Sequence, residues 1–261
     1  MILGLQRPDR GDIRLFGCPL AQKNLESLRR VGSLVESPSL YENLTARENL
    51  EVHRRLLSLP RRAIDEALAI VDLLNAADRL VKGYSSGMKQ RLGIALALLG
   101  NPDLLLLDEP TNGLDPAGIR EVRTLIRDLP NRCGATVFLS SHLLAEVEQV
   151  ATQLAIISNG ELKFEGSRQD LDAHTHQMIV VEVDQPKQAT AFLSQSGYTA
   201  ICDGYRLRIS PGSNCEPAKI NSILVQAGFA VSRLVMQHMA LEDFFLELTS
   251  LSDHLEEAAV Q

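Results

Sequence analysis

The 261-residue sequence contains no tryptophan, and aromatic side chains make up 4% of it. It lacks any apolar run near the roughly 18 residues that a membrane-spanning helix needs. Its start also lacks the basic region, apolar region and cleavage site of a secretory signal peptide. These absences predict a protein that stays in the cytoplasm, so that any role at a membrane comes through a partner.

The sequence also lacks cysteine pairs at the spacing of a metal site, and it has no excess of positive charge. No two of the four cysteines have C-x-x-C spacing, which argues against a metal site or a disulfide framework and favours free thiols in a reducing compartment. The net charge is -7, and the isoelectric point is about 5.4. Because nucleic-acid binding depends on Lys and Arg neutralising phosphates, this balance predicts no nucleic-acid partner. The cysteines are Cys18, Cys133, Cys202 and Cys215.

Hydrophobic residues are abundant, at 45% of the chain, and they follow two successive patterns. Residues 1–166 alternate short apolar strands with helical spacing. This pattern predicts an α/β domain with a mostly parallel sheet and helices on both faces. Residues 167–250 follow the order βαββαβ and predict a small α+β domain of ferredoxin-like type. Residues 251–261 are expected to be a tail.

The strand Leu104–Leu107 is apolar at every position and is therefore expected to be buried on both faces. Asp108 and Glu109 follow it directly. Ligands bind at the carboxyl edge of an open α/β sheet. One carboxylate there could hold Mg²⁺ while the other orients a water for attack on a phosphate. Taken alone, the pair fits solvated acids at a strand end equally well.

The start of one expected helix carries polar residues that could meet an anion. Ser85 is placed to cap a helix whose first turn has no acidic residue, so its exposed amides would favour an anion. Asp115 and Pro116 suit the N-cap and first position of another helix. His142 follows the expected strand 136–140, where an imidazole could contact a phosphate. Each feature alone also fits ordinary capping or a surface histidine.

The order of these features resembles the ABC ATPase family closely. Tyr84–Arg91 resembles the signature motif, and Leu104–Glu109 resembles the Walker B strand with its catalytic glutamate. Gly113–Asp115 resembles the D-loop, and Ser141–His142 the switch histidine. Four motifs in order at the family spacing are specific. The resemblance covers residues 1–166, and the C-terminal extension is similar to one in some bacterial exporters.

The resemblance implies a role for each site residue. It implies that Glu109 is the general base, that Asp108 organises Mg²⁺ and that His142 contacts the γ-phosphate. The residues implied to contact ATP are Ser85, Ser86, Gly87, Met88, Asp115 and Glu36.

The segments 31–38 and 41–45 are similar to the bacitracin-resistance and lantibiotic-immunity branch of the family. In this chain Glu36 stands where the family has the Q-loop glutamine, and a glutamate there can still ligate Mg²⁺. The signature also departs from L-S-G-G-Q, with Tyr84, Ser86 and Met88 as replacements.

The phosphate-binding motif G-x-x-x-x-G-K-[ST] is absent, because no lysine in the sequence follows a glycine. The resemblance places Met1–Leu5 at the end of the helix that follows this loop. It therefore predicts that an N-terminal segment is missing, and with it the strand expected beside Leu104–Leu107, which would leave that strand with an uncovered edge.

These inferences predict an ATP-binding and ATP-hydrolysing ABC transporter subunit, most consistent with an exporter, peripheral to the cytoplasmic face of the membrane. Its expected partners are transmembrane permease subunits and a second ATP-binding subunit, joined head to tail around ATP and Mg²⁺. The expected contact with the permease is the segment 36–44. One alternative is a non-catalytic subunit that contributes only its signature motif to a competent partner. Another is a soluble ABC protein acting on ribosomes or DNA, but the chain lacks the paired ATPase domains or long coiled coils of those proteins.

Overall fold

In a computed structural model of the chain, residues 1–20, 25–174, 177–209, 216–238, 241 and 244–245 are described. The chain divides into two compact units, Met1–Val150 and Ala151–Gln261. The predicted domain boundary lies later, after residue 166, and stays a prediction. The predicted tail, residues 251–261, lies outside the described residues.

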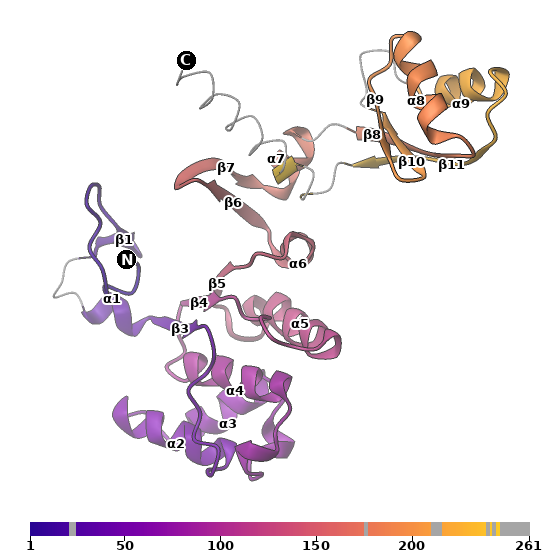
Figure 1. Cartoon of the computed structure of the whole chain (residues 1–261). Helices are drawn as coiled ribbons and strands as arrows, with labels where there is room; N and C mark the ends of the chain where they lie inside the picture. The colour runs from indigo at the N-terminus through magenta and orange to yellow at the C-terminus, as the bar shows by residue number, and fades with distance from the viewer. Residues whose placement is uncertain (21–24, 175–176, 210–215, 239–240, 242–243, 246–261) are drawn as a thin grey trace. The chain divides into compact units, whose positions relative to one another are not determined.

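The first unit contains a parallel three-stranded sheet of order β3-β4-β5 (Figure 1). A small antiparallel pair precedes the sheet. The strands of this unit are β1 (Arg14–Leu15), β2 (Cys18–Pro19), β3 (Val31–Val35), β4 (Leu104–Asp108) and β5 (Thr136–Ser140). Its helices are α1 (Leu25–Arg29), α2 (Ala46–Leu56), α3 (Arg62–Ile70), η1 (Leu74–Ala76), η2 (Val81–Gly83), α4 (Ser86–Leu98), α5 (Pro116–Cys133) and α6 (Leu144–Val150).

The core of this unit is one hydrophobic cluster that joins the sheet to helices α2, α3, α4 and α5. Leu34, Leu105 and Leu107 are buried on one face of the sheet and belong to one hydrophobic cluster with residues of α4 and α5. On the opposite face, Val35 is 53% exposed and Phe138 is 56% exposed. The helical cover that the sequence predicts on both faces is not observed among the described residues, and the strand 104–107 is fully buried on one face only.

The predicted uncovered edge of the strand 104–107 is wrong. β4 pairs with β3 along one edge and with β5 along the other, so it is the central strand. Within the described part of the chain, the strands of this sheet with an unpaired outer edge are β3 and β5. The prediction placed a strand absent from this sequence beside Leu104–Leu107, whereas β3 and β5, the neighbours of β4 in chain order, pair with both of its edges.

Two glycines let the elements of this core approach closely. A methyl group on Gly32 of β3 would lie 2.1 Å from the carbonyl oxygen of Ala97 in α4. One on Gly93 of α4 would lie 2.6 Å from Cβ of Pro38. Neither position has room for a side chain, so glycine sets the distance between α4 and the segments packed on it.

Gly32→Ala is therefore expected to lower the free energy of unfolding by about 1–3 kcal/mol, the usual cost of overpacking a core. The clash is with backbone, which cannot move aside as a flexible side chain can. Gly100→Ala is the matched control, because a methyl group there meets no atom within 4 Å. The measurement is urea unfolding of both variants, and equal stability of the two would contradict the packing described here.

The second unit holds an antiparallel hairpin, β6–β7, and a four-stranded antiparallel sheet of order β11-β8-β10-β9. The predicted order βαββαβ is present as β8-α8-β9-β10-α9-β11. Its strands are β6 (Gln153–Ser158), β7 (Glu161–Ser167), β8 (Gln177–Val183), β9 (Ala200–Asp203), β10 (Arg206–Ile209) and β11 (Val231–His238). Its helices are α7 (Arg168–His174), α8 (Pro186–Gln195) and α9 (Pro217–Gln226).

Candidate nucleotide site

The parallel register brings three strand ends to one edge of the first sheet. Val35, Asp108 and Ser140 are direct neighbours across β3, β4 and β5. The residues that follow them therefore leave the sheet at the same edge. Glu36 and Glu109 both take a positive φ there, at 55° and 47°. A positive φ is unfavourable for a glutamate and is found preferentially where function requires a sharp turn.

Asp108, Glu109 and His142 form a connected group at this edge. The Ser140 hydroxyl lies 2.6 Å from Asp108 Oδ1 and can donate to it. Ser140 Oγ also accepts a hydrogen bond from the Glu109 backbone amide at 3.0 Å. His142 Nδ1 lies 2.8 Å from Glu109 Oε2. The structure thus pairs the glutamate and the histidine that the sequence placed in separate motifs.

The exposed fractions of this group suit a site that is open to a ligand. The Glu109 side chain is 29% exposed and that of His142 is 61% exposed. Ser140 is the residue that the sequence analysis does not single out. Ser140 can be identified as a site residue from its place at the end of β5, but only once β5 is known to pair with β4.

The signature residues lie at the N-terminus of α4. Ser85 is the N-cap, and its hydroxyl oxygen accepts a hydrogen bond from the Met88 amide at 3.2 Å. Ser85 and Ser86 are exposed, whereas Gly87 is buried. A methyl group on Gly87 would lie 3.3 Å from Cα of Gly118 in α5. The structure therefore gives Gly87 a packing role between two helices.

Asp115 is the N-cap of α5, as predicted, and Pro116 is its first residue. Its Oδ1 accepts a hydrogen bond from the Gly118 amide at 3.2 Å. Because Gly118 also packs against Gly87, the D-loop residue and the signature turn meet through the starts of α4 and α5.

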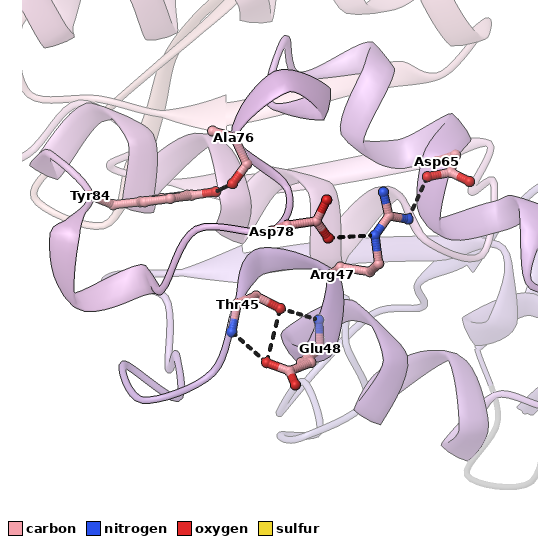
Figure 2. A network of polar contacts seen from close by, with 7 residues as sticks. All are labelled: Thr45, Arg47, Glu48, Asp65, Ala76, Asp78 and Tyr84. Carbon is pink, nitrogen blue, oxygen red and sulfur yellow. Dashed lines mark hydrogen bonds and ion pairs between the residues drawn. The ribbon is translucent and has the colours of Figure 1, made fainter.

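A polar network holds the segment before the signature motif (Figure 2). Arg47 of α2 donates from Nη1 to Asp65 Oδ1 at 2.6 Å and from Nε to Asp78 Oδ1 at 3.1 Å. Hydrogen bonds to Asp65 and then Asp78 raise the pKa of Arg47. Close by, the Tyr84 hydroxyl donates to the Ala76 carbonyl oxygen at 2.6 Å. Burial raises the pKa of Tyr84, so this hydroxyl keeps its proton and remains a donor.

The start of α2 is closed by a capping box. The Thr45 hydroxyl oxygen accepts from the Glu48 amide, and Glu48 Oε2 accepts from the Thr45 amide at 2.7 Å. The backbone hydrogen bond from Thr45 lowers the pKa of Glu48. These contacts fix the end of the segment 36–44. This segment is also joined to the residues just before Tyr84, because the Val81 amide donates a hydrogen bond to the Leu44 carbonyl oxygen at 2.9 Å.

Comparison with known proteins agrees with this geometry. The family model for ABC transporters matches residues 1–112. The bacitracin transport ATP-binding protein BcrA of Bacillus licheniformis is 40% identical over 253 residues, covering 95% of this chain and 82% of that protein. The chain belongs to the ABC transporter ATP-binding family.

Two further comparisons support the assignment. The lantibiotic transport ATP-binding protein SrtF of Streptococcus pyogenes is 42% identical over 165 residues, covering 63% of this chain and 70% of that protein. A solved structure of an ATP-binding subunit of an ABC transporter superposes with a TM-score of 0.54 at 31% identity, over 66% of this chain and 73% of that one. The predicted α/β fold of the ABC ATPase type is thereby confirmed.

The carboxylates at the sheet edge fit a Mg²⁺ ion that arrives with a nucleotide. The described residues contain no group of three or more His, Cys, Asp or Glu side chains able to hold a metal alone. Mg²⁺ is commonly held by one or two carboxylates together with substrate phosphates and water. Asp108 and Glu36, at neighbouring strand ends, provide such a partial donor set.

Among the residues that the structure describes, every helix is too short or too polar to span a membrane.

Proposed function

We propose that this chain is the ATP-binding and ATP-hydrolysing subunit of an ABC exporter, acting with permease subunits at the cytoplasmic face of a membrane. The observation that carries the proposal is the single sheet edge that gathers Glu36, Asp108, Glu109 and His142. The names of the relatives, which transport bacitracin and a lantibiotic, support an export role.

In this proposal Glu109 is the general base for the water that attacks the γ-phosphate. The hydrogen bond from His142 Nδ1 holds the Glu109 carboxylate in one orientation. His142 leaves its other ring nitrogen for the phosphate. A bound Mg²⁺ would neutralise charge on the phosphate oxygens, with Asp108 and Glu36 as its protein ligands.

The signature turn supplies the second half of the site across a head-to-tail dimer. Ser85 and Ser86 are exposed at the start of α4, where the helix dipole favours phosphate. Asp115 lies at the start of the helix packed beside it. A nucleotide held between this turn and the phosphate loop of a second subunit would join the two chains, and closure would drive the permease.

The 261 residues contain no G-x-x-x-x-G-K-[ST] motif. The proposal therefore assigns to this chain the signature, the Mg²⁺ carboxylates and the base, and assigns the phosphate cradle to residues outside this sequence. The second candidate is a subunit that contributes only its signature to a competent partner.

The two candidates are separated by measuring ATP hydrolysis of this chain alone, with a partner subunit that carries a phosphate loop, and in a form extended to carry its own loop. Hydrolysis by the extended form supports the proposed function. The second candidate is supported if hydrolysis requires the general base of the partner subunit and is unchanged when Glu109 of this chain is substituted.

Ser85→Arg is expected to block ATP-driven dimerisation in the extended form while each monomer still binds nucleotide. The bulky side chain would stand where the phosphates of the opposing site must approach. Light scattering with and without ATP gives the dimer, and calorimetry gives monomer affinity. Ser222→Arg is the matched control, because it makes the same change at an exposed serine in α9 of the second unit. Equal loss of monomer binding in Ser85→Arg would contradict the role across the interface.

A further inference from the structure

The four-stranded sheet of the second unit has one face packed on helices and one face turned away from them. The packed face belongs to a cluster with residues of α8 and α9, in the orange and yellow part of Figure 1. Because successive strand residues point to opposite faces, the residues between these lie on the other face. The packed strand residues are Ile179, Val181, Val183, Leu207 and Ile209.

The face turned away from the helices carries a row of four charges, one on each strand. Arg233 of β11 pairs in register with Glu182 of β8, Glu182 with Arg206 of β10, and Arg206 with Asp203 of β9. We call Arg233, Glu182, Arg206 and Asp203, in this order, the charge row. Its signs alternate across the whole sheet: positive, negative, positive, negative.

Contacts within the sheet hold the charge row in place. Arg206 Nε lies 3.1 Å from Glu182 Oε1, and Arg233 Nη1 lies 3.9 Å from the same oxygen. Asp203 Oδ2 is paired with Arg208 Nη2 at 2.9 Å. The ends of the row remain the most accessible, since the side chains of Arg233 and Asp203 are 61% and 59% exposed. The row thus presents ordered charges of both signs to solvent.

We propose that this face binds the same face of a second copy of the chain, around a two-fold axis that runs parallel to the strands between β8 and β10. Such an axis sets each end of the charge row opposite the other end in the second copy. Arg233 then faces Asp203, and Glu182 faces Arg206, so every charge meets its opposite. The alternating row is complementary to its own two-fold image.

The two ends of the neighbouring row of side chains agree with this orientation. Val235, Val180, Arg208 and Ile201 are in register beside the charge row. The same axis sets Val235 opposite Ile201 of the second copy, and Ile201 is 62% exposed in one chain. An axis along the charge row instead would set each charge opposite itself, which is repulsive. The charge row therefore favours one orientation of the second copy, with the two-fold axis parallel to the strands.

The contact is small. Four strands about 4.8 Å apart, paired over about four residues of about 3.4 Å each, make a face of roughly 200–300 Å² per chain, below the roughly 800 Å² per partner of a typical stable interface. Association through this face is therefore expected to be weak, to need high protein concentration and to fall as ionic strength rises.

The test is sedimentation equilibrium of the full chain at low ionic strength, without nucleotide. The wild-type chain is expected to form dimers that dissociate on addition of salt. Arg233→Glu and Asp203→Lys should each weaken dimerisation about tenfold or more, because each sets like charges opposite one another at two symmetry-related points. Both residues are largely exposed, so the folded chain should tolerate the change.

A mixture of the two variants decides the geometry. In a dimer of one Arg233→Glu chain and one Asp203→Lys chain, the two substituted positions face each other with opposite charges. At the other end of the row, the unchanged Asp203 of the first chain faces the unchanged Arg233 of the second. Differently labelled chains of the two variants should therefore form mixed dimers at close to wild-type strength.

Arg62→Glu is the control, because it makes the same change in net charge as Arg233→Glu at an 80% exposed side chain in the first unit. Three results would each overturn the proposal: wild-type association no stronger than that of the single variants, failure of the mixture to recover, or equal weakening by Arg62→Glu. None of these outcomes depends on ATP, so they are independent of the proposed function.

Discussion

Glu109→Gln is expected to abolish ATP turnover and to leave ATP binding intact, in a form of the protein that carries a phosphate-binding loop. The amide keeps the shape of the side chain and its contact with His142, but it can no longer accept the proton of the attacking water. Loss of a general base commonly lowers the rate by about 10²–10⁴-fold. With binding intact and hydrolysis blocked, ATP should trap the dimer.

The measurements are phosphate release and light scattering after addition of Mg-ATP. Glu66→Gln is a matched control, because it makes the same chemical change on α3, at a side chain that is 65% exposed. Near-normal hydrolysis by Glu109→Gln would remove Glu109 from the role of base. A dimer that fails to accumulate would show that turnover was lost for another reason, such as altered binding.

The pairing of Glu109 with His142 adds a sharper expectation to this result. Residues that act as a unit are strongly non-additive when both are changed. Adding His142→Ala to Glu109→Gln should therefore lower hydrolysis little further. A large additional loss would show that the histidine acts on the phosphate independently of the glutamate.

Local features of the site are predictable from the sequence because they depend on neighbouring residues. Asp115 and Pro116 predict the start of α5, and Ser85 predicts the start of α4, since capping needs a side chain only a few positions from the amides it satisfies. The end of β4 before Glu109 follows from a short apolar run stopped by two acids.

Long-range features are not predictable in the same way. The sequence predicts an open edge for the Leu104–Leu107 strand, but β3 and β5 pair with both of its edges, and such pairing joins segments far apart in the sequence. The family resemblance implies that Gly87 lets a phosphate approach closely. Its contact with Gly118 can be predicted only when the packing of α4 against α5 is known. The charge row is a matter of register, and register appears only when strands far apart in sequence are paired.

The 261-residue chain alone is expected to bind Mg-ATP without useful affinity and not to hydrolyse it. Three contributions to phosphate binding are missing from its sequence: the amide cradle of the loop, the lysine charge and the hydroxyl that ligates Mg²⁺. A lysine about 4 Å from a phosphate contributes about 4 kcal/mol at an effective dielectric constant of about 20, close to a thousandfold in affinity.

The side chains that remain at the sheet edge disfavour binding of a nucleotide without Mg²⁺. Asp108, Glu109 and Glu36 are acidic and would repel phosphates unless Mg²⁺ is firmly held, and they form no metal cluster among the described residues. Calorimetry with Mg-ATP on the 261-residue chain, and on a form extended by in-frame upstream residues, tests the expectation. Binding by the extended form alone would place the cradle there. Micromolar binding by the 261-residue chain would show either that the alignment of Met1–Leu5 with the helix after the loop is wrong or that another element of this chain replaces the loop.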